Sequence, residues 1–283
     1  MTEDVVDAVF EAVVETAPEI RTGLRGRRER VDEENPSDET QMAADLWADE
    51  LLGERITAID GIGEFASEER EAVEDCGEGL SVAVDPLDGS SNLKSNNSMG
   101  TIVGIYDAPL PAKGRDLVAA AYVLYGPITT MMVARDGTVT EYEITEDGRR
   151  TIEEGVDLPG DPVVYGFGGR VPDWTDGFTE YAREIEGELK LRYGGAMIGD
   201  VNQVMTYGGI FAYPGLQSRS EGKLRLQFEG NPIAHIVETA GGASSDGGQS
   251  LLDVDPTELH QRVPVHVGNE SLIERLEATL AED

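Results

Sequence analysis

The sequence predicts an α/β (α+β) fold built in layers of helices and sheets. Segments with apolar residues at helical spacing alternate with short β-branched segments along most of the 283-residue chain. Residues 3–16 predict a first helix that ends near Pro18, and residues 41–56 predict a second one after a turn-like stretch at 35–40. The chain is long enough to bury a core in one large domain or two modest ones.

The elements after the second helix divide into two groups. The first group is a run of strands at 81–84, 100–106, 117–125, 128–135 and 138–144. Proline and glycine then become frequent at 155–162, which predicts a boundary between domains at 1–157 and 158–283. The second group alternates strands at 163–166, 209–213 and 263–267 with helices at 175–187, 200–206, 231–240 and 270–280.

The charge balance is strongly acidic. Asp and Glu number 56 against 22 Lys and Arg, a formal net charge of −34, and the acids are spread over nearly every segment. We interpret this as adaptation to a very salty cytoplasm, where self-repulsion is screened; an ordinary acidic protein is the alternative. Nucleic acids and anionic membranes are not expected as partners, because no basic face is available.

Several features bear on location and on other chemistries. The acidic first residues do not resemble a signal peptide, and no apolar run is long enough to span a membrane, so we expect a cytoplasmic protein. Cys76 is the single cysteine, which excludes an internal disulfide. The three histidines lack zinc-like spacing and are expected to be packing or surface residues. The basic run at 24–30 is expected to be a solvated helix end, with anion binding as the alternative.

The stretch DPLDGSS at 85–91 combines features that one ordinary turn does not need together. Pro86 is expected to stop a buried strand, which leaves Asp85 and Asp88 at a sheet end. Paired carboxylates, with the Leu87 carbonyl between them, suit a hard cation such as Mg²⁺. Gly89 allows close approach of backbone, and serines at 90 and 91 at a helix start suit a phosphate. A capped turn without a ligand is the alternative.

One turn does not complete an octahedral site, so further acids are expected from elsewhere. Glu68 and Glu69 follow a short apolar stretch, and Glu229 follows an alternating strand and precedes a helix that begins at Pro232. Because the chain has 56 acidic residues, composition alone does not identify these three glutamates as residues of the site.

The motifs together resemble a known family. DPLDGSSN, SEE, LRYGGAMIGDV, YGGIFAYP, GKLRLQFEGNP and LHQRVPVHVG occur in the order found in class I fructose-1,6-bisphosphatases, of the lithium-sensitive, magnesium-dependent phosphatase superfamily. The resemblance covers about residues 37–280. It implies a layered αβαβα sandwich of two mixed sheets. It also implies hydrolysis of the 1-phosphate of fructose 1,6-bisphosphate, a gluconeogenic reaction. The attacking water would be activated by two or three Mg²⁺ per subunit, with Mn²⁺ as an alternative.

The resemblance also implies roles for residues of this chain. Glu68, Asp85, the Leu87 carbonyl, Asp88 and Glu229 resemble the metal ligands; Glu69, with Asp45 as an acidic partner, resembles the group that activates water. Gly89, Ser90 and Ser91 would hold the 1-phosphate. Tyr193, Tyr213 and Lys223 would surround the 6-phosphate and sugar, with Met197, Arg225 and Asp88 near the sugar. Arg192 would reach a neighbouring subunit's site in a homotetramer or homodimer.

Departures from the family pattern leave the substrate partly open. Phe167 and Arg170 stand where the family has an Asn and a Tyr that bind the 6-phosphate. Sedoheptulose bisphosphate is therefore an alternative substrate, and inositol monophosphate or a nucleotide 3′-phosphate are more distant ones within the superfamily. A catalytically silent sugar-phosphate sensor and a structural metal-binding protein are the alternatives from other classes.

Overall fold

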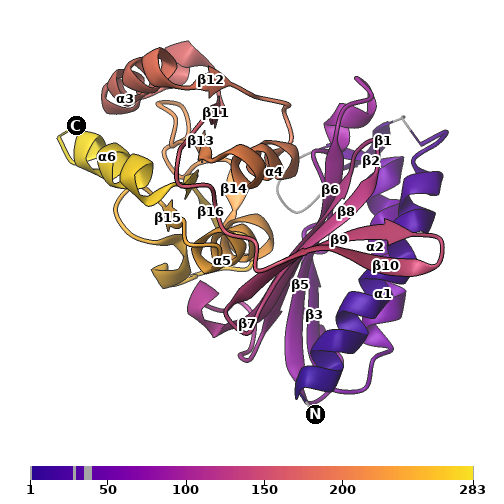
Figure 1. Cartoon of the computed structure of the whole chain (residues 1–283). Helices are drawn as coiled ribbons and strands as arrows, with labels where there is room; N and C mark the ends of the chain where they lie inside the picture. The colour runs from indigo at the N-terminus through magenta and orange to yellow at the C-terminus, as the bar shows by residue number, and fades with distance from the viewer. Residues whose placement is uncertain (1, 28–29, 35–39, 283) are drawn as a thin grey trace.

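The computed structural model describes residues 2–27, 30–34 and 40–282. Five layers follow one another across the molecule (Figure 1). Helices α1 (Thr2–Gly23) and α2 (Ala43–Thr57) cover one face of an eight-stranded sheet. Helices α4 (Met197–Tyr207) and α5 (Asn231–Thr239) lie between that sheet and a five-stranded one, whose outer face carries α3 (Asp176–Glu188) and α6 (Glu270–Leu280). The predicted α/β class with two mixed sheets is therefore confirmed.

The large sheet has the strand order β10-β9-β8-β7-β6-β5-β3-β4. Strands β3 and β5 are parallel, and the other neighbours are antiparallel. The bounds are β3 Ile62–Ser67, β4 Glu74–Asp75, β5 Leu80–Asp88, β6 Met99–Tyr106, β7 Leu117–Tyr125, β8 Thr129–Arg135, β9 Thr138–Thr145 and β10 Gly148–Glu154.

The small sheet has the order β12-β11-β13-β17-β15 and contains both parallel and antiparallel pairs. Its strands are β11 Val164–Phe167, β12 Lys190–Leu191, β13 Gly209–Tyr213, β15 Ala243–Ser245 and β17 Val265–Gly268. Two short pairs complete the set: β1 (Arg30–Glu34) with β2 (Thr40–Met42), and β14 (Leu224–Arg225) with β16 (Arg262–Val263). The domain boundary at 157/158 stays a prediction.

Each interface between layers has its own apolar core. Phe10, Leu52 and Phe65 lie between the first helices and the large sheet. Tyr106, Phe211 and Phe228 belong to the core between the two sheets, and Phe178 and Tyr181 to the outer one. These buried side chains hold the two sheets in a fixed relation, so that residues at their facing ends can form one site. Among the described residues, no helix is both long and apolar enough to cross a membrane.

The first helix is longer than the sequence predicts. It continues through Pro18 to Gly23, although Pro18 removes one hydrogen bond of the helix. The apolar face continues past the proline with the buried Ile20, and Arg21 fastens the last turn to the large sheet, where it donates to Thr129 Oγ1 at 2.8 Å and to the Gly126 carbonyl at 3.0 Å. Tertiary packing therefore overrides the local stop signal.

Three other boundaries differ from the prediction. Pro86 does not end its strand: β5 reaches Asp88 because a register shift between Asp85 and Asp88 absorbs the proline in a bulge. The expected strand at 263–267 is divided between β16 and β17 at Pro264. Glu229 follows a strand of two residues and lies in a π-helical turn, Leu226–Gly230, that leads into α5. Residues 35–39 of the predicted turn and residues 28–29 of the basic run lie outside the described residues, and Thr40 lies in β2.

Candidate active site

The turn that ends β5 forms the centre of the site. Asp85 and Asp88 flank the bulge and are both buried. Asp85 Oδ1 accepts the Leu87 N–H at 2.9 Å, which fixes the turn from within. Gly89 then takes a left-handed conformation with φ +73°, and a Cβ there would lie 2.1 Å from the Cβ of Ala196. Glycine is therefore required at this position, where the turn meets the second half of the chain.

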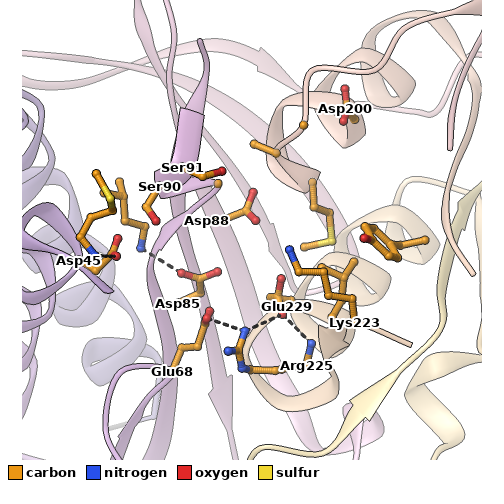
Figure 2. A pocket seen from close by; sticks show the side chains of 18 of the residues that line it. Asp45, Glu68, Asp85, Asp88, Ser90, Ser91, Asp200, Lys223, Arg225 and Glu229 are labelled. Atoms are coloured by element: carbon orange, nitrogen blue, oxygen red, sulfur yellow. Dashed lines mark hydrogen bonds and ion pairs between the residues drawn. The ribbon is translucent and has the colours of Figure 1, made fainter. Parts of the chain in front are cut away.

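Acids from three separate segments meet at this turn. Ligand oxygens of Asp85, Asp88 and Glu229 lie within 4.8 Å of one another, and all three residues are buried. Glu68 follows β3, where its N–H donates to the Val84 carbonyl at 2.9 Å, and its side chain points toward the same centre (Figure 2). Buried carboxylate oxygens at this spacing are the donor set that a hard divalent cation prefers, so the residues fit a magnesium site.

Burial and mutual repulsion raise the pKa values of these acids. Loss of solvation raises the pKa of Asp85 well above its usual range, and the nearby Glu68, Asp88 and Glu229 charges add to the effect. The pKa of Glu229 is raised by the same causes, although Arg225 opposes them. Burial raises the pKa of Asp88 to about 7, against the hydrogen bond that Ile198 donates to Oδ2 at 2.7 Å. A cation would relieve this cost.

Arg225 brings a positive charge into the acid cluster. Its guanidinium lies 2.6 Å from Glu68 and 3.9 Å from Glu229, and its side chain is nearly fully buried. The Arg225 N–H also donates to Glu229 Oε2 at 2.5 Å, which closes the π-helical turn. Arg225 therefore orients two of the acids, in addition to lining the cavity where substrate binding was predicted.

The serines of the motif open a short helix. Residues Ser90–Leu93 form a 3₁₀ helix directly after Gly89, and both serines line the cavity with Lys94. Both serines therefore lie in the same cavity as the acids, and their role in binding a phosphate stays a prediction.

The opposite wall comes from the second half of the chain. Tyr193, Met197 and Tyr213 line it, and the Lys223 ammonium lies 6.0 Å from the centre of the Tyr213 ring. Partial burial in the cavity raises the pKa of Tyr193 to about 12, although 46% of its surface stays exposed. The cavity has a volume of about 360 Å³, enough for a sugar phosphate.

The two residues predicted to handle a proton also line this cavity. Glu69 is half-buried, with its N–H donating to Ser67 Oγ at 3.3 Å. Asp45 is buried and accepts the Met42 N–H at 2.7 Å, which caps the start of α2. Asp45 therefore has a structural task besides any catalytic one.

Nearly all predicted site residues meet in the one cavity. Those that line it are Asp45, Glu68, Glu69, Asp85, Leu87, Asp88, Gly89, Ser90, Ser91, Tyr193, Met197, Tyr213, Lys223, Arg225 and Glu229. Arg192 is exposed and lies outside this lining. The prediction missed Lys94 and Asp200, which also line the cavity. The scarcity of lysine was a usable signal for Lys94, whereas Asp200 is one of 56 acids and has no distinguishing spacing.

Comparison with known proteins decides the family. The model of the fructose-1-6-bisphosphatase N-terminal domain matches residues 22–150, and that of the C-terminal domain matches 158–281. The chain is 63% identical over 280 residues to the class 1 fructose-1,6-bisphosphatase of Natronomonas pharaonis, covering 98% of this chain and 99% of the relative. It is 60% identical to that of Halobacterium salinarum, with 98% of both covered. The chain belongs to the class 1 fructose-1,6-bisphosphatase family.

A solved bisphosphatase structure has the same fold. The crystal structure of Leishmania major fructose-1,6-bisphosphatase in holo form superposes with a TM-score of 0.92 at 26% identity, covering 99% of this chain and 95% of that one. The resemblance inferred from the motifs is therefore confirmed, and the relatives include proteins of haloarchaea.

The two departures from the bisphosphatase pattern lie outside the cavity lining. Phe167 is buried in the outer core, where its ring meets Phe178 at 5.3 Å and Trp174 at 6.2 Å between centroids. Arg170 is exposed. Phe167 therefore serves packing between the small sheet and α3.

Proposed function

We infer that this cavity hydrolyses the 1-phosphate of fructose 1,6-bisphosphate, giving fructose 6-phosphate and phosphate in gluconeogenesis. Family membership over nearly the full chain supports the reaction. The observation that carries the inference is the convergence of Asp85, Asp88 and Glu229 beside the serine-containing turn. This arrangement supports a function in which cation ligands would lie next to a phosphate-binding turn.

Glu68, Asp85, Asp88, Glu229 and the Leu87 carbonyl would hold the divalent cations, which we propose to be two or three Mg²⁺ per subunit with Mn²⁺ as a substitute. Bound Mg²⁺ would supply Lewis-acid stabilisation of the phosphate charge and a lower pKa for the attacking water. Glu69 would accept the proton of that water, with Asp45 as its acidic partner; both residues line the cavity. The buried Arg225 keeps Glu68 and Glu229 oriented toward the centre.

The substrate would lie between two anion-binding walls. Gly89, Ser90 and Ser91 would hold the 1-phosphate through N–H and hydroxyl groups. Tyr193, Tyr213 and Lys223 would hold the 6-phosphate on the opposite wall, with Asp88, Met197 and Arg225 near the sugar. A sugar bisphosphate carries about four negative charges, so it can bind to this acidic protein only where cations and scarce basic side chains prevail.

We also propose that the protein works in a salty cytoplasm as a homodimer or homotetramer. The acidic composition and the haloarchaeal relatives support the first point. For the second, Arg192 is exposed beside two large exposed side chains, Leu191 and Tyr193, and would reach the site of a neighbouring subunit. Nucleic acid and membrane are not proposed as partners.

Phosphate release from a panel of sugar phosphates tests the function. The panel contains fructose 1,6-bisphosphate, sedoheptulose 1,7-bisphosphate and inositol 1-phosphate, each with and without Mg²⁺ in concentrated KCl. The highest kcat/KM is expected with fructose 1,6-bisphosphate, and only with the cation. A higher kcat/KM with either other substrate, or release that does not depend on the cation, would contradict the proposal.

A further inference from the structure

The backbone of one residue, Gly194, is held through its N–H and its carbonyl by side chains from both halves of the chain. Asp200 Oδ1 accepts its N–H at 2.6 Å. The amides of Asn92 and Asn97 both donate to its carbonyl, at 3.0 and 2.9 Å. We propose that Asn92, Asn97 and Asp200 are positioning residues that clasp Gly194 and so set the spacing between the 1-phosphate turn and the 6-phosphate wall. The inference rests on the proposed function and adds to it a determinant of specificity for bisphosphates.

The clasp joins the two walls directly. Asn92 belongs to the 3₁₀ helix that contains Ser90 and Ser91, and it also donates to the Ser98 carbonyl at 2.9 Å. Gly194 immediately follows Tyr193, which lines the opposite wall. A shift of Gly194 relative to Asn92 therefore changes the distance between the groups proposed to bind the two phosphates.

A second set of contacts between the two walls should confine this shift to the segment that contains Tyr193. The Ile198 N–H donates to Asp88 Oδ2 at 2.7 Å, and Gly89 packs against Ala196. These contacts tie the start of α4 to the β5 turn without using Gly194. Loss of the clasp should therefore release the Tyr193 segment while the acid cluster and the serines stay in place.

The chemistry of Asp200 argues for a positioning task. It lines a cavity for a polyanion, where a carboxylate repels the substrate, yet it is only 4% exposed. Figure 2 shows it apart from Asp85, Asp88 and Glu229, so it is not placed to share their cation. Its Oδ1 accepts the Gly194 N–H at 2.6 Å. This hydrogen bond stabilises the turn at Gly194, which would compensate for the repulsion between the Asp200 carboxylate and the substrate.

The test compares two substrates that share the scissile phosphate. Fructose 1-phosphate lacks the 6-phosphate, so its hydrolysis does not need the Tyr193 wall. We expect Asn92→Ala and Asp200→Ala to lower kcat/KM for fructose 1,6-bisphosphate by about tenfold or more, because a displacement of about 1 Å can cost about a hundredfold. The same variants should lower kcat/KM for fructose 1-phosphate by less than about threefold, and the inhibition constant of inorganic phosphate should stay within about twofold.

Three further variants guard against a trivial result. Asn97→Ala removes one of two donors from an exposed position and should give a smaller loss in the same direction. Asp200→Asn keeps an acceptor oxygen and should recover most of the preference for fructose 1,6-bisphosphate over fructose 1-phosphate, measured as the ratio of their kcat/KM values. Asn96→Gly is the matched control, since Asn96 is exposed with φ +57° and lies in the same loop outside the clasp. It should leave kcat/KM unchanged for both substrates.

The outcomes separate the two inferences. If the wild-type chain fails to hydrolyse fructose 1,6-bisphosphate, the proposed function is wrong. The clasp does not set the spacing if the wild-type chain is active and the three alanine variants fail to separate the two substrates. That result would be an equal loss of kcat/KM for both substrates, or no loss for either, in Asn92→Ala, Asn97→Ala and Asp200→Ala. A correctly folded fraction, measured by circular dichroism in the assay salt, normalises each kcat.

Discussion

Replacing Asp88 with Asn should stabilise the metal-free protein while it removes activity. The pKa of this buried carboxyl is raised from 3.8 to about 7, chiefly by burial. An acid whose pKa is higher in the folded state destabilises that state at every pH above the folded pKa, here by about 4 kcal/mol. Asparagine keeps an oxygen that can accept the Ile198 N–H, so the substitution removes the charge and preserves the contact.

The assay is urea unfolding in EDTA and concentrated KCl at two pH values. At pH 8, Asp88→Asn should raise the free energy of unfolding by about 2–4 kcal/mol. The gain should shrink as the pH falls from 7 toward 3.8, because the wild-type carboxyl then becomes neutral too. Mg²⁺ should stabilise the wild-type protein by mass action and the variant much less.

A matched control has the opposite sign. Asp49 is also buried, but it pairs with Arg70 at 3.0 Å, so Asp49→Asn should destabilise the protein. If Asp88→Asn is no more stable than the wild-type chain at pH 8 in EDTA, the acid cluster is not electrostatically strained, and the reasoning is refuted.

Two more predictions follow from other parts of the molecule. Lys223→Ala should raise KM for fructose 1,6-bisphosphate by about tenfold or more and leave Mg²⁺ affinity, measured by calorimetry, unchanged; an unchanged KM would remove Lys223 from the site. His266 is buried against Phe178, and burial lowers its pKa from 6.5 to about 4. Its neutral form therefore contributes stability that is complete above pH 6.5 and is lost, by about 3 kcal/mol, as the pH falls to 4. His266→Gln should flatten urea-unfolding stability across that pH range, and an unchanged slope would contradict this.

Local chemistry made the centre of the site predictable. The DPLDGSS motif combines two acids, a glycine and two serines within seven residues, and all five line the cavity. For Gly89 the reason is stereochemical, since the left-handed φ and the contact with Ala196 exclude any side chain. Glu68 and Glu229 were different, because any one of 56 acids could have been chosen without the family motifs.

Features that depend on distant contacts were not predictable. Pro18 is a local stop signal, but burial of Ile20 and the anchoring of Arg21 on the large sheet carry α1 past it. Pro86 is absorbed by a bulge that depends on the partner strand β6. Asp200 and Asn92 meet through Gly194 although they lie 108 positions apart, and no periodicity or spacing in one sequence reports such a contact.

The most direct test of the account is phosphate release by Glu229→Gln during Mg²⁺ titration. Glutamine preserves the shape of the π-helical turn and removes one charged ligand from the Asp85, Asp88 and Glu229 group. We predict that turnover of fructose 1,6-bisphosphate at millimolar Mg²⁺ falls by about a thousandfold, since a lost charged ligand costs several kcal/mol of charge stabilisation. Turnover within about tenfold of the wild-type rate would contradict the assignment of these acids as the cation site.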